Sequence, residues 1–243
     1  MTTALLSALA QEQHGLVALL TETRVVRRAG RDFTLGTLHG HAVVLALSRI
    51  GKVAAATTAT TLIEAFGVQR IVFTGVAGSL SPDVHVGDLV VASAFVQHDM
   101  DASPLFARFE IPLYGRTRFA CDEGLTACLF QASRDALAQW PDEQTGTSVH
   151  QGLVASGDRF LATSTDSHAV RATLQAAGMH ALAVEMEGAA VAQVCHDYGM
   201  PFAAVRTISD SADEQAPMNF QQFVNRVAGR YSCSVVSQLM RAL

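Results

Sequence analysis

Charged residues, aromatic residues and cysteine are all scarce in this chain of 243 residues. Charged side chains make up 16% and aromatic ones 7%, whereas an average domain is about 25% charged. The low charge indicates that much of the chain is buried, which excludes an intrinsically disordered protein. The four cysteines show neither CxxC spacing nor disulfide density, so we expect reduced thiols in a cytoplasmic protein.

Long basic tracts and long apolar runs are also missing. Seventeen Lys and Arg against 22 Asp and Glu give a net charge of −5. The densest basic cluster is Arg24, Arg27, Arg28 and Arg31, which offers no face that could follow a phosphate backbone. No uncharged run reaches the roughly 18 residues of a membrane span, and residues 1–6 lack the basic start of a signal peptide. We therefore expect no nucleic-acid partner, no membrane and a cytoplasmic location.

Short apolar runs alternate with longer helical patterns along the chain. The runs predict strands at residues 4–9, 41–48, 70–76, 88–96, 152–156 and 202–208, and helices at 52–66, 184–198 and 220–243. This alternation predicts an α/β fold with a largely parallel sheet, helices on both faces and a single domain over residues 1–243. Residues 99–119 form a long irregular segment, which is typical of a functional or partner-contacting loop.

Polar side chains follow several of the predicted strands. Ligands of open parallel sheets bind beyond the carboxyl ends of the strands, where Glu12, Arg206, Asp210 and the glycine turn at residues 75–78 are expected to converge. Simpler interpretations remain: Glu12 could face water, and Asp210 could cap the next segment. Arg206 lies within an apolar strand, so it needs a carboxylate or a ligand as partner.

Motifs for a cofactor or a metal are absent from the sequence. The glycine turn has neither Walker nor GxGxxG spacing. The nine histidines include no HExxH, and residues 98–101 cannot all face one ion from an extended strand. We therefore expect no metal and no cofactor.

Two glutamates, Glu185 and Glu187, interrupt an apolar stretch of small residues. Acids are favoured at a helix N-terminus, and this is the simplest interpretation. Positions i and i+2 do not share a helix face, so one of the two is expected to point inward. An inward carboxylate needs hydrogen-bond donors, which the hydroxyl groups of a sugar supply.

Six blocks of sequence resemble those of the nucleoside phosphorylase superfamily. The two most specific are Ala-Val-Glu-Met-Glu-Gly-Ala-Ala at residues 183–190 and Arg-Thr-Ile-Ser-Asp-Ser-Ala-Asp at 206–213; the others are residues 50–56, 73–80, 96–99 and 154–160. They occur in order over almost the whole chain. They most resemble the hydrolytic branch, the 5′-methylthioadenosine/S-adenosylhomocysteine nucleosidases.

The resemblance implies a fold, a reaction and an assembly. The fold is a three-layer αβα sandwich with a mixed sheet, and the assembly is a homodimer. The reaction is hydrolysis of the N-ribosidic bond, which releases adenine and a 5-substituted ribose. Methylthioadenosine, S-adenosylhomocysteine and aminodeoxyfutalosine all remain possible substrates.

The resemblance also implies roles for individual residues. Asp210 corresponds to the general acid at purine N7, and Glu12 to the base that activates water. The expected substrate-binding residues are Met186 and Glu187 at the ribose, Phe160 and Leu161 at adenine, Arg206 and Gly78 near the water and sugar, Ile50 and Phe220 at the 5′ substituent, and Ser209. Asp210 can act as a general acid near neutral pH only if it keeps its proton, which requires an enclosed, water-poor site. A general base on the opposite face of the sugar is the arrangement of an inverting glycosidase.

Two departures from the family pattern bear on which reaction is catalysed. Arg49 stands where glycine is frequent, and Val76 where serine is frequent. Arg49 keeps open a phosphate-dependent phosphorylase, although the Gly-Asp-Pro-x-Arg segment of those enzymes is absent. Two non-catalytic functions also stay open, a nucleoside sensor and a purely structural interaction domain. A sensor would give Asp210 and Glu12 no catalytic role. A purely structural domain would give Arg206 and Glu187 no function.

Overall fold

One mixed sheet organises the chain in a computed structural model that describes residues 1–139 and 146–243. Its strands are β1 (Thr3–Ser7), β2 (Thr21–Arg28), β3 (Arg31–Leu38), β4 (His41–Leu47), β5 (Arg70–Ser79), β6 (Leu89–Gln97), β7 (Arg118–Ala120), β8 (Val149–Ser156), β9 (Ala181–Glu185) and β10 (Phe202–Asp210). The helices are α1 (Leu16–Leu19), α2 (Lys52–Phe66), α3 (Glu123–Ala138), α4 (Ser164–Ala176), α5 (Gly188–Tyr198), α6 (Ala216–Phe223) and α7 (Gly229–Ala242), with a 3₁₀ turn η1 (Ala10–Gln13) and a π-helical turn η2 (Val224–Ala228).

The sheet has an open part and a closed part. The open part runs β2–β3–β4–β1–β5, with β1 parallel to both of its neighbours. From β5 the pairing continues through β10, β6, β8 and β9 and returns to β5, so these five strands close into a ring. Because β1, β5 and β10 are mutually parallel neighbours, their carboxyl ends lie at one edge.

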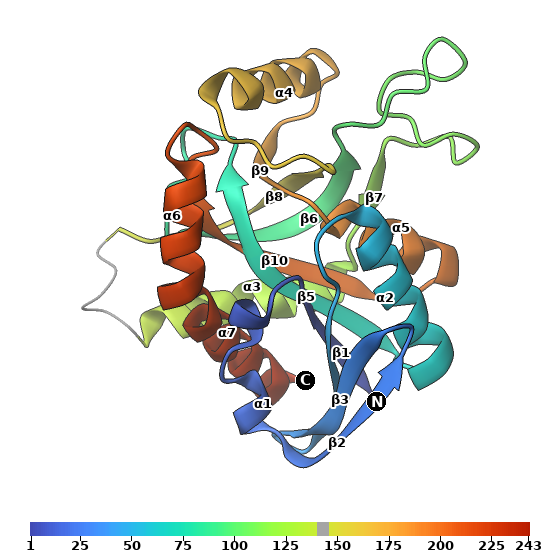
Figure 1. The fold of residues 1–243 in the computed structure, drawn as a ribbon, viewed down its shortest axis with the longest axis vertical. Coiled ribbons are helices and arrows are strands. Elements are labelled where there is room, and N and C mark those ends of the chain that lie inside the picture. The colour runs from blue at the N-terminus through green and yellow to red at the C-terminus, as the bar shows by residue number, and fades with distance from the viewer. Residues whose placement is uncertain (140–145) are drawn as a thin grey trace.

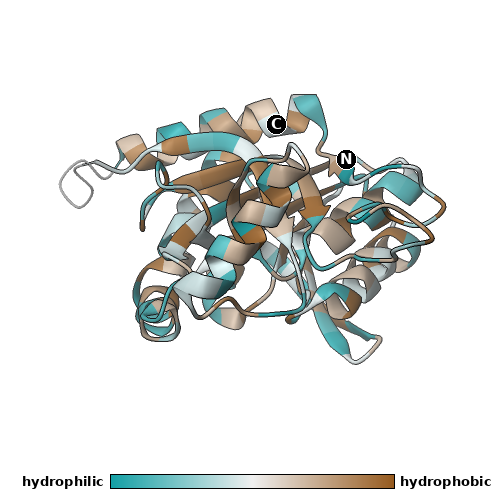
Figure 2. Ribbon diagram, turned by 90° about the horizontal axis from the view of Figure 1, so that it is seen from above, coloured by the Kyte–Doolittle hydropathy of each residue, from teal (hydrophilic) through white to brown (hydrophobic). Residues whose placement is uncertain are grey.

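Helices cover both faces of the sheet, as the sequence predicts. Figure 1 shows α2 and α5 on one side and α3 with α7 on the other. Alternate residues of a strand enter different cores: Ala4 and Leu6 pack in the core beneath α2 and α5, whereas Leu5 packs in the core beneath α3 and α7. Figure 2 shows the hydrophobic colouring concentrated on the strands between these helices. The predicted α/β sandwich with a mixed sheet is confirmed.

Several element boundaries differ from the prediction. The strand predicted at residues 70–76 continues to Ser79, through the expected glycine turn, because residues 77–79 pair with β10 and β9. Residues 181–185 form a strand, so the helix predicted from 184 begins only at Gly188. The C-terminal helix predicted from 220 begins at Ala216 and contains the π-helical turn. The hairpin of β2 and β3 was not predicted.

Between β6 and β7 the chain forms the expected irregular segment, which Figure 1 shows projecting from the body as two loops. Within the described residues, no helix combines the length and the apolar character needed to cross a membrane.

Candidate active site

An apolar cavity of about 320 Å³ lies at the carboxyl ends of β1, β5 and β10. Its size is within the range of small-molecule sites. The residues that line it are Ala8, Leu9, Glu12, Ile50, Val76, Ala77, Gly78, Phe160, Val184, Glu185, Met186, Glu187, Ser209, Asp210 and Phe220. The lining is mostly apolar, yet it contains four carboxyl groups.

Glu12 lies in the 3₁₀ turn that follows β1, with 2% of its surface exposed. Its Oε2 accepts hydrogen bonds from the backbone N–H groups of Ala8 and Leu9 at 2.8 Å, and its Oε1 accepts one from Val76 at 3.0 Å. Burial raises the pKa of Glu12, while these donors and the nearby Arg206 oppose the rise. The interpretation of Glu12 as a residue facing water is therefore wrong.

Asp210 is the last residue of β10 and is 2% exposed. Its Oδ2 accepts a hydrogen bond from Ser209 Oγ at 2.7 Å, and its Oδ1 accepts one from the Ala212 N–H at 2.9 Å. Burial raises the pKa of Asp210 against the effect of these two donors. A Cβ atom on Gly78 would lie 2.9 Å from Asp210 Oδ1, so the carboxyl group approaches β5 where only glycine leaves room.

Glu185 and Glu187 both point inward, which corrects the expectation that only one of them does. Glu185 is 7% and Glu187 is 6% exposed. Both are buried because Glu185 ends β9 and Glu187 is the N-cap of α5, so the two are not on one helix. Burial, reinforced by the charge of Glu185, raises the pKa of Glu187 to about 8. Glu187 Oε1 accepts a hydrogen bond from the Gly51 N–H at 2.8 Å.

Arg206 has the carboxylate partner that the sequence required. Its Nη2 donates to Glu185 Oε2 at 2.8 Å, and only 1% of the arginine is exposed. The guanidinium also lies over the Phe73 ring, 4.0 Å from its centroid. Glu185 further accepts from Ser156 Oγ and from the N–H of Gly188. Arg206 therefore lies behind the cavity wall, where it holds Glu185.

The apolar part of the cavity is formed by residues of β5 and β9, by loops and by α6. Phe160 follows β8 and packs edge-on against Phe220 of α6, with ring centroids 5.6 Å apart. Ile50 follows β4 and is 55% exposed, so one side of the cavity opens to water. A smaller adjoining cavity is lined by Leu161, Met186 and Asp210, among other residues. It adds about 30 Å³ to the site beside Phe160.

The structure brings together nearly all the residues selected from the sequence. Glu12, Ile50, Gly78, Phe160, Met186, Glu187, Ser209, Asp210 and Phe220 line the main cavity, Leu161 lines the adjoining one, and Arg206 lies behind the wall. Sequence reasoning missed Glu185 as the partner of Arg206. The signal was present, because a buried arginine and a glutamate in an apolar stretch each required an opposite charge.

Arg49, the residue that favoured the phosphorylase alternative, does not line the cavity. Its Nη2 donates to the backbone oxygen of Gly30 at 2.6 Å, in the turn of the β2–β3 hairpin. Among the described residues, the lining of the main cavity contains no arginine or lysine. A phosphate ion there would lack the fixed cation that such sites use.

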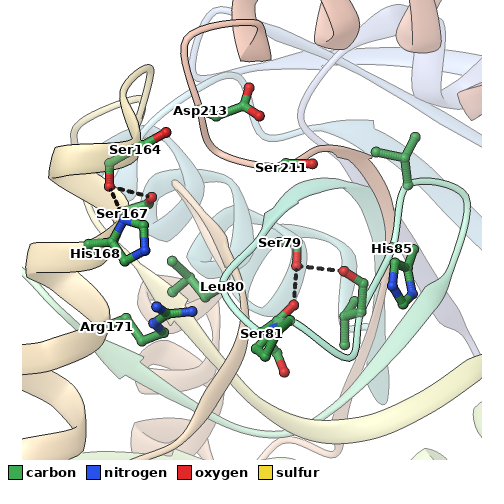
Figure 3. A pocket seen from close by; sticks show the side chains of 13 residues that line it. Ser79, Leu80, Ser81, His85, Ser164, Ser167, His168, Arg171, Ser211 and Asp213 are labelled. Atoms are coloured by element: carbon green, nitrogen blue, oxygen red, sulfur yellow. Dashed lines mark hydrogen bonds between the residues drawn. The ribbon is translucent and has the colours of Figure 1, made fainter.

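A second cavity of about 330 Å³ lies nearby and is polar. Figure 3 shows Arg171 and His168 of α4 facing the loop that contains Ser81, with Ser211 and Asp213 on the neighbouring segment. His168 and His85 are exposed. This cavity combines both signs of charge with solvent-exposed groups, so nothing in it favours one ligand chemistry.

Comparisons with known proteins show the family of the chain. The model of the phosphorylase superfamily matches residues 2–241. A 5′-methylthioadenosine/S-adenosylhomocysteine nucleosidase from Actinobacillus succinogenes is 35% identical over 244 residues and covers 100% of both chains. An aminodeoxyfutalosine nucleosidase from Helicobacter pylori is 38% identical over 213 residues, 86% of each chain.

Solved structures give the same result. The 5′-methylthioadenosine/S-adenosylhomocysteine nucleosidase of Neisseria meningitidis in complex with methylthio-immucillin-A superposes with a TM-score of 0.88 at 34% identity, over 100% of this chain and 99% of that one. A futalosine hydrolase mutant from Helicobacter pylori also gives 0.88, at 32% identity and full coverage of both chains. The chain therefore belongs to the phosphorylase superfamily and, within it, to the family of the 5′-methylthioadenosine/S-adenosylhomocysteine nucleosidases.

Proposed function

We propose that this protein is a purine nucleosidase that hydrolyses the N-ribosidic bond of 5′-substituted adenine nucleosides and releases adenine. The observation that carries the proposal is the apolar cavity in which Glu12, Glu187 and Asp210 are all buried and all have a raised pKa. Strongly perturbed carboxyl groups in one cleft are typical of acid–base catalysis. The relatives named above are nucleosidases, and two of them match the full length of the chain. In this proposal residues 1–243 act as one nucleosidase domain.

Asp210 supplies the proton to the leaving base. As the C1′–N9 bond breaks, its electron pair moves into the purine, and a proton on N7 stabilises the departing adenine. A carboxyl group can donate that proton near neutral pH only if it has retained it, which its burial beside Gly78 favours. Ser209 Oγ and the Ala212 N–H hold both oxygens in place.

Glu12 removes a proton from the attacking water. The water oxygen bonds to C1′ on the face opposite adenine, its proton passes to Glu12, and a 5-substituted ribose results. Three backbone N–H groups and Arg206 favour the carboxylate form that a base needs. Val76 replaces the hydroxyl expected near the water, but its N–H fixes Glu12 directly.

The remaining lining residues bind the two ends of the substrate. Glu187 and Met186 face the ribose, and a carboxyl oxygen of Glu187 accepts hydrogen bonds from the sugar hydroxyls, which stabilises the positive charge that grows on the sugar. Phe160 stacks on adenine, and the backbone of Leu161 binds its edge. Ile50 and Phe220 pack against the 5′ substituent, for which methylthio, homocysteinyl and aminodeoxyfutalosine groups remain candidates.

The functional unit in this proposal is a homodimer in the cytoplasm. Large apolar side chains are exposed beside the open side of the cavity and on the projecting segment: Val53 is 79% exposed, Leu105 84% and Leu113 91%. Such a surface is typical of a protein interface, and a second copy there would cover Ile50. All four cysteines are free, which fits a reducing compartment.

The test is adenine release from 5′-methylthioadenosine by the purified protein in phosphate-free buffer, repeated with phosphate added. We expect equal rates, with free 5-methylthioribose as the second product. Release only with phosphate, giving a ribose 1-phosphate, would make the protein a phosphorylase. No release from this nucleoside, from S-adenosylhomocysteine or from aminodeoxyfutalosine, together with tight binding of one of them, would indicate a sensor.

A further inference from the structure

Three residues outside the cavity lining form a closed ring of hydrogen bonds. Lys52 Nζ donates to Asp99 Oδ1 at 2.7 Å, and the Asp158 N–H donates to Asp99 Oδ2 at 2.9 Å. The Lys52 N–H in turn donates to Asp158 Oδ1 at 2.8 Å. The ring joins three segments: Lys52 is the first residue of α2, Asp99 lies two residues after the end of β6, and Asp158 lies in the loop after β8. These segments are about 50 residues or more apart in the sequence. The pairing of β6 with β8 already brings the loops of Asp99 and Asp158 together, and the Lys52 side chain ties the start of α2 to them.

Two of the segments joined by the ring also contact or contain a residue that lines the cavity. On one side, the Gly51 N–H next to Lys52 donates to Glu187 Oε1 at 2.8 Å. On the other side, Asp158 lies two residues before Phe160. The ring of hydrogen bonds therefore connects the loop that donates to Glu187 with the loop that contains Phe160.

Lys52 and Asp99 are partly shielded from water, whereas Asp158 is exposed. The side chain of Lys52 is 16% exposed and that of Asp99 31%. Lys52 Nζ makes a second hydrogen bond, to Gln97 Oε1 at 3.1 Å, and Gln97 Nε2 donates to Gln193 Oε1 of α5 at 2.9 Å. The ring is thus anchored to β6 and to the helix that begins after Glu187.

We propose that Lys52 and Asp99 are positioning residues that fix the distance between Glu187 and Phe160, and so between the ribose-binding and base-binding parts of the site. The inference rests on the proposed function. Neither residue lines the cavity, so neither is expected to touch the substrate. An ion pair this close to water adds little to folding stability, whereas a displacement of about 1 Å in a positioned group can cost up to about 100-fold in rate.

The experiment compares Lys52→Met, Asp99→Asn and the double variant with the wild-type enzyme. We expect KM for 5′-methylthioadenosine to rise about tenfold in each single variant, since both loops contact bound substrate, with a smaller fall in kcat. The inhibition constant of adenine is expected to rise as well, because adenine binds against Phe160 and has no ribose to contact Glu187. The double variant should be no worse than either single variant, because each one opens the same ring.

The controls separate positioning from folding and from the reaction itself. Lys52→Arg keeps the charge and is expected to recover most of the wild-type KM. Asp32→Asn removes the ion pair between Asp32 Oδ1 and Arg27 Nε, which are 3.9 Å apart in the β2–β3 hairpin. This variant should leave KM and the adenine inhibition constant unchanged. Melting temperatures and gel filtration show whether each variant is folded and in the wild-type assembly.

Two results would overturn the inference: an unchanged KM and adenine inhibition constant in folded Asp99→Asn, or strictly additive effects in the double variant. Failure of the proposed function is a separate outcome, since it would appear as a wild-type protein that releases no adenine. In that case calorimetric binding of adenine to the same variants still tests the ring.

Discussion

Two cavities of nearly equal volume, about 320 and 330 Å³, lie on either side of the segment that follows β10. Asp210 lines the first and Asp213, three residues later, lines the second. Asp210 is 2% exposed among apolar side chains, whereas Asp213 is only half-buried among serines and exposed histidines. The same residue type therefore has two different environments within one short segment.

The difference shows what makes a carboxyl group useful for catalysis. In the first cavity the apolar lining raises the pKa of Glu12, Glu187 and Asp210, with backbone N–H groups and Arg206 limiting the rise. The second cavity has more polar side chains in its lining, but no buried carboxyl group in the lining that the structure describes. Proton transfer depends on the surroundings of the titrating group more than on the number of polar residues nearby.

The largest expected effect separates the two aspartates. Asp210→Asn removes the proton donor and should lower kcat by about 10²- to 10⁴-fold while leaving substrate binding largely intact. Asp213→Asn should stay within about threefold of wild type, because a half-exposed side chain outside the main cavity does not transfer the proton. Steady-state kinetics and calorimetric binding measure both quantities. Wild-type rates in Asp210→Asn would contradict the assignment.

A second prediction moves the same carboxyl group without changing it. Gly78→Ala places a Cβ atom 2.9 Å from Asp210 Oδ1, so the carboxyl group must shift. We expect kcat/KM to fall by roughly 10- to 100-fold. Gly124→Ala is the matched control, since its Cβ atom would meet nothing closer than 3.6 Å. Equal kinetics in the two variants would show that the position of Asp210 is not critical.

A third prediction concerns stability. The pKa of Glu187 is raised to about 8 in the folded protein from about 4.5, so the unfolded chain releases this proton first as the pH rises. Folding stability is therefore lost between about pH 4.5 and 8. Glu187→Gln removes this loss and should raise stability at pH 8 by about 1 kcal/mol while lowering activity.

The measurement is thermal melting of Glu187→Gln and wild type from pH 4 to 8. The gain should be absent at pH 4, where both states keep the proton, and greatest at pH 8. Glu22→Gln, on an exposed strand, should show no such trend. A gain that is constant with pH would contradict the explanation.

The smallest expected effect is in the polar cavity. Arg171 faces that cavity from α4 (Figure 3), and Arg171→Ala should keep kcat/KM within about twofold of wild type. The same adenine-release assay measures it. A large loss of activity would show that the second cavity takes part in the reaction.

The sequence predicted the fold class and most of the site but not every boundary. Helix α2 was predicted to the residue, because its Ala- and Thr-rich pattern ends at Gly67 in a left-handed conformation. Residues 77–79 and 181–185 were misjudged because their strand character depends on pairing between distant segments. The β2–β3 hairpin was missed since β2, an exposed edge strand rich in arginine, lacks an apolar signal.

The site shows the same division between local and distant information. Motif resemblance selected Asp210, Glu12 and Glu187, and the structure brings them to one cavity. The pairing of Arg206 with Glu185 joins residues 21 positions apart on different strands. The Lys52–Asp99–Asp158 ring spans three segments, so no local pattern indicates it.

The pH dependence of kcat/KM for 5′-methylthioadenosine tests the central claim most directly, since that claim is that burial keeps Asp210 protonated for catalysis. An acid catalyst loses activity as the pH rises through its pKa. With the pKa of Asp210 raised by burial, the decline should come at a higher pH than the pKa of an ordinary aspartic acid would place it. A decline already complete between about pH 4 and 5, as for an ordinary aspartic acid in water, would contradict the account.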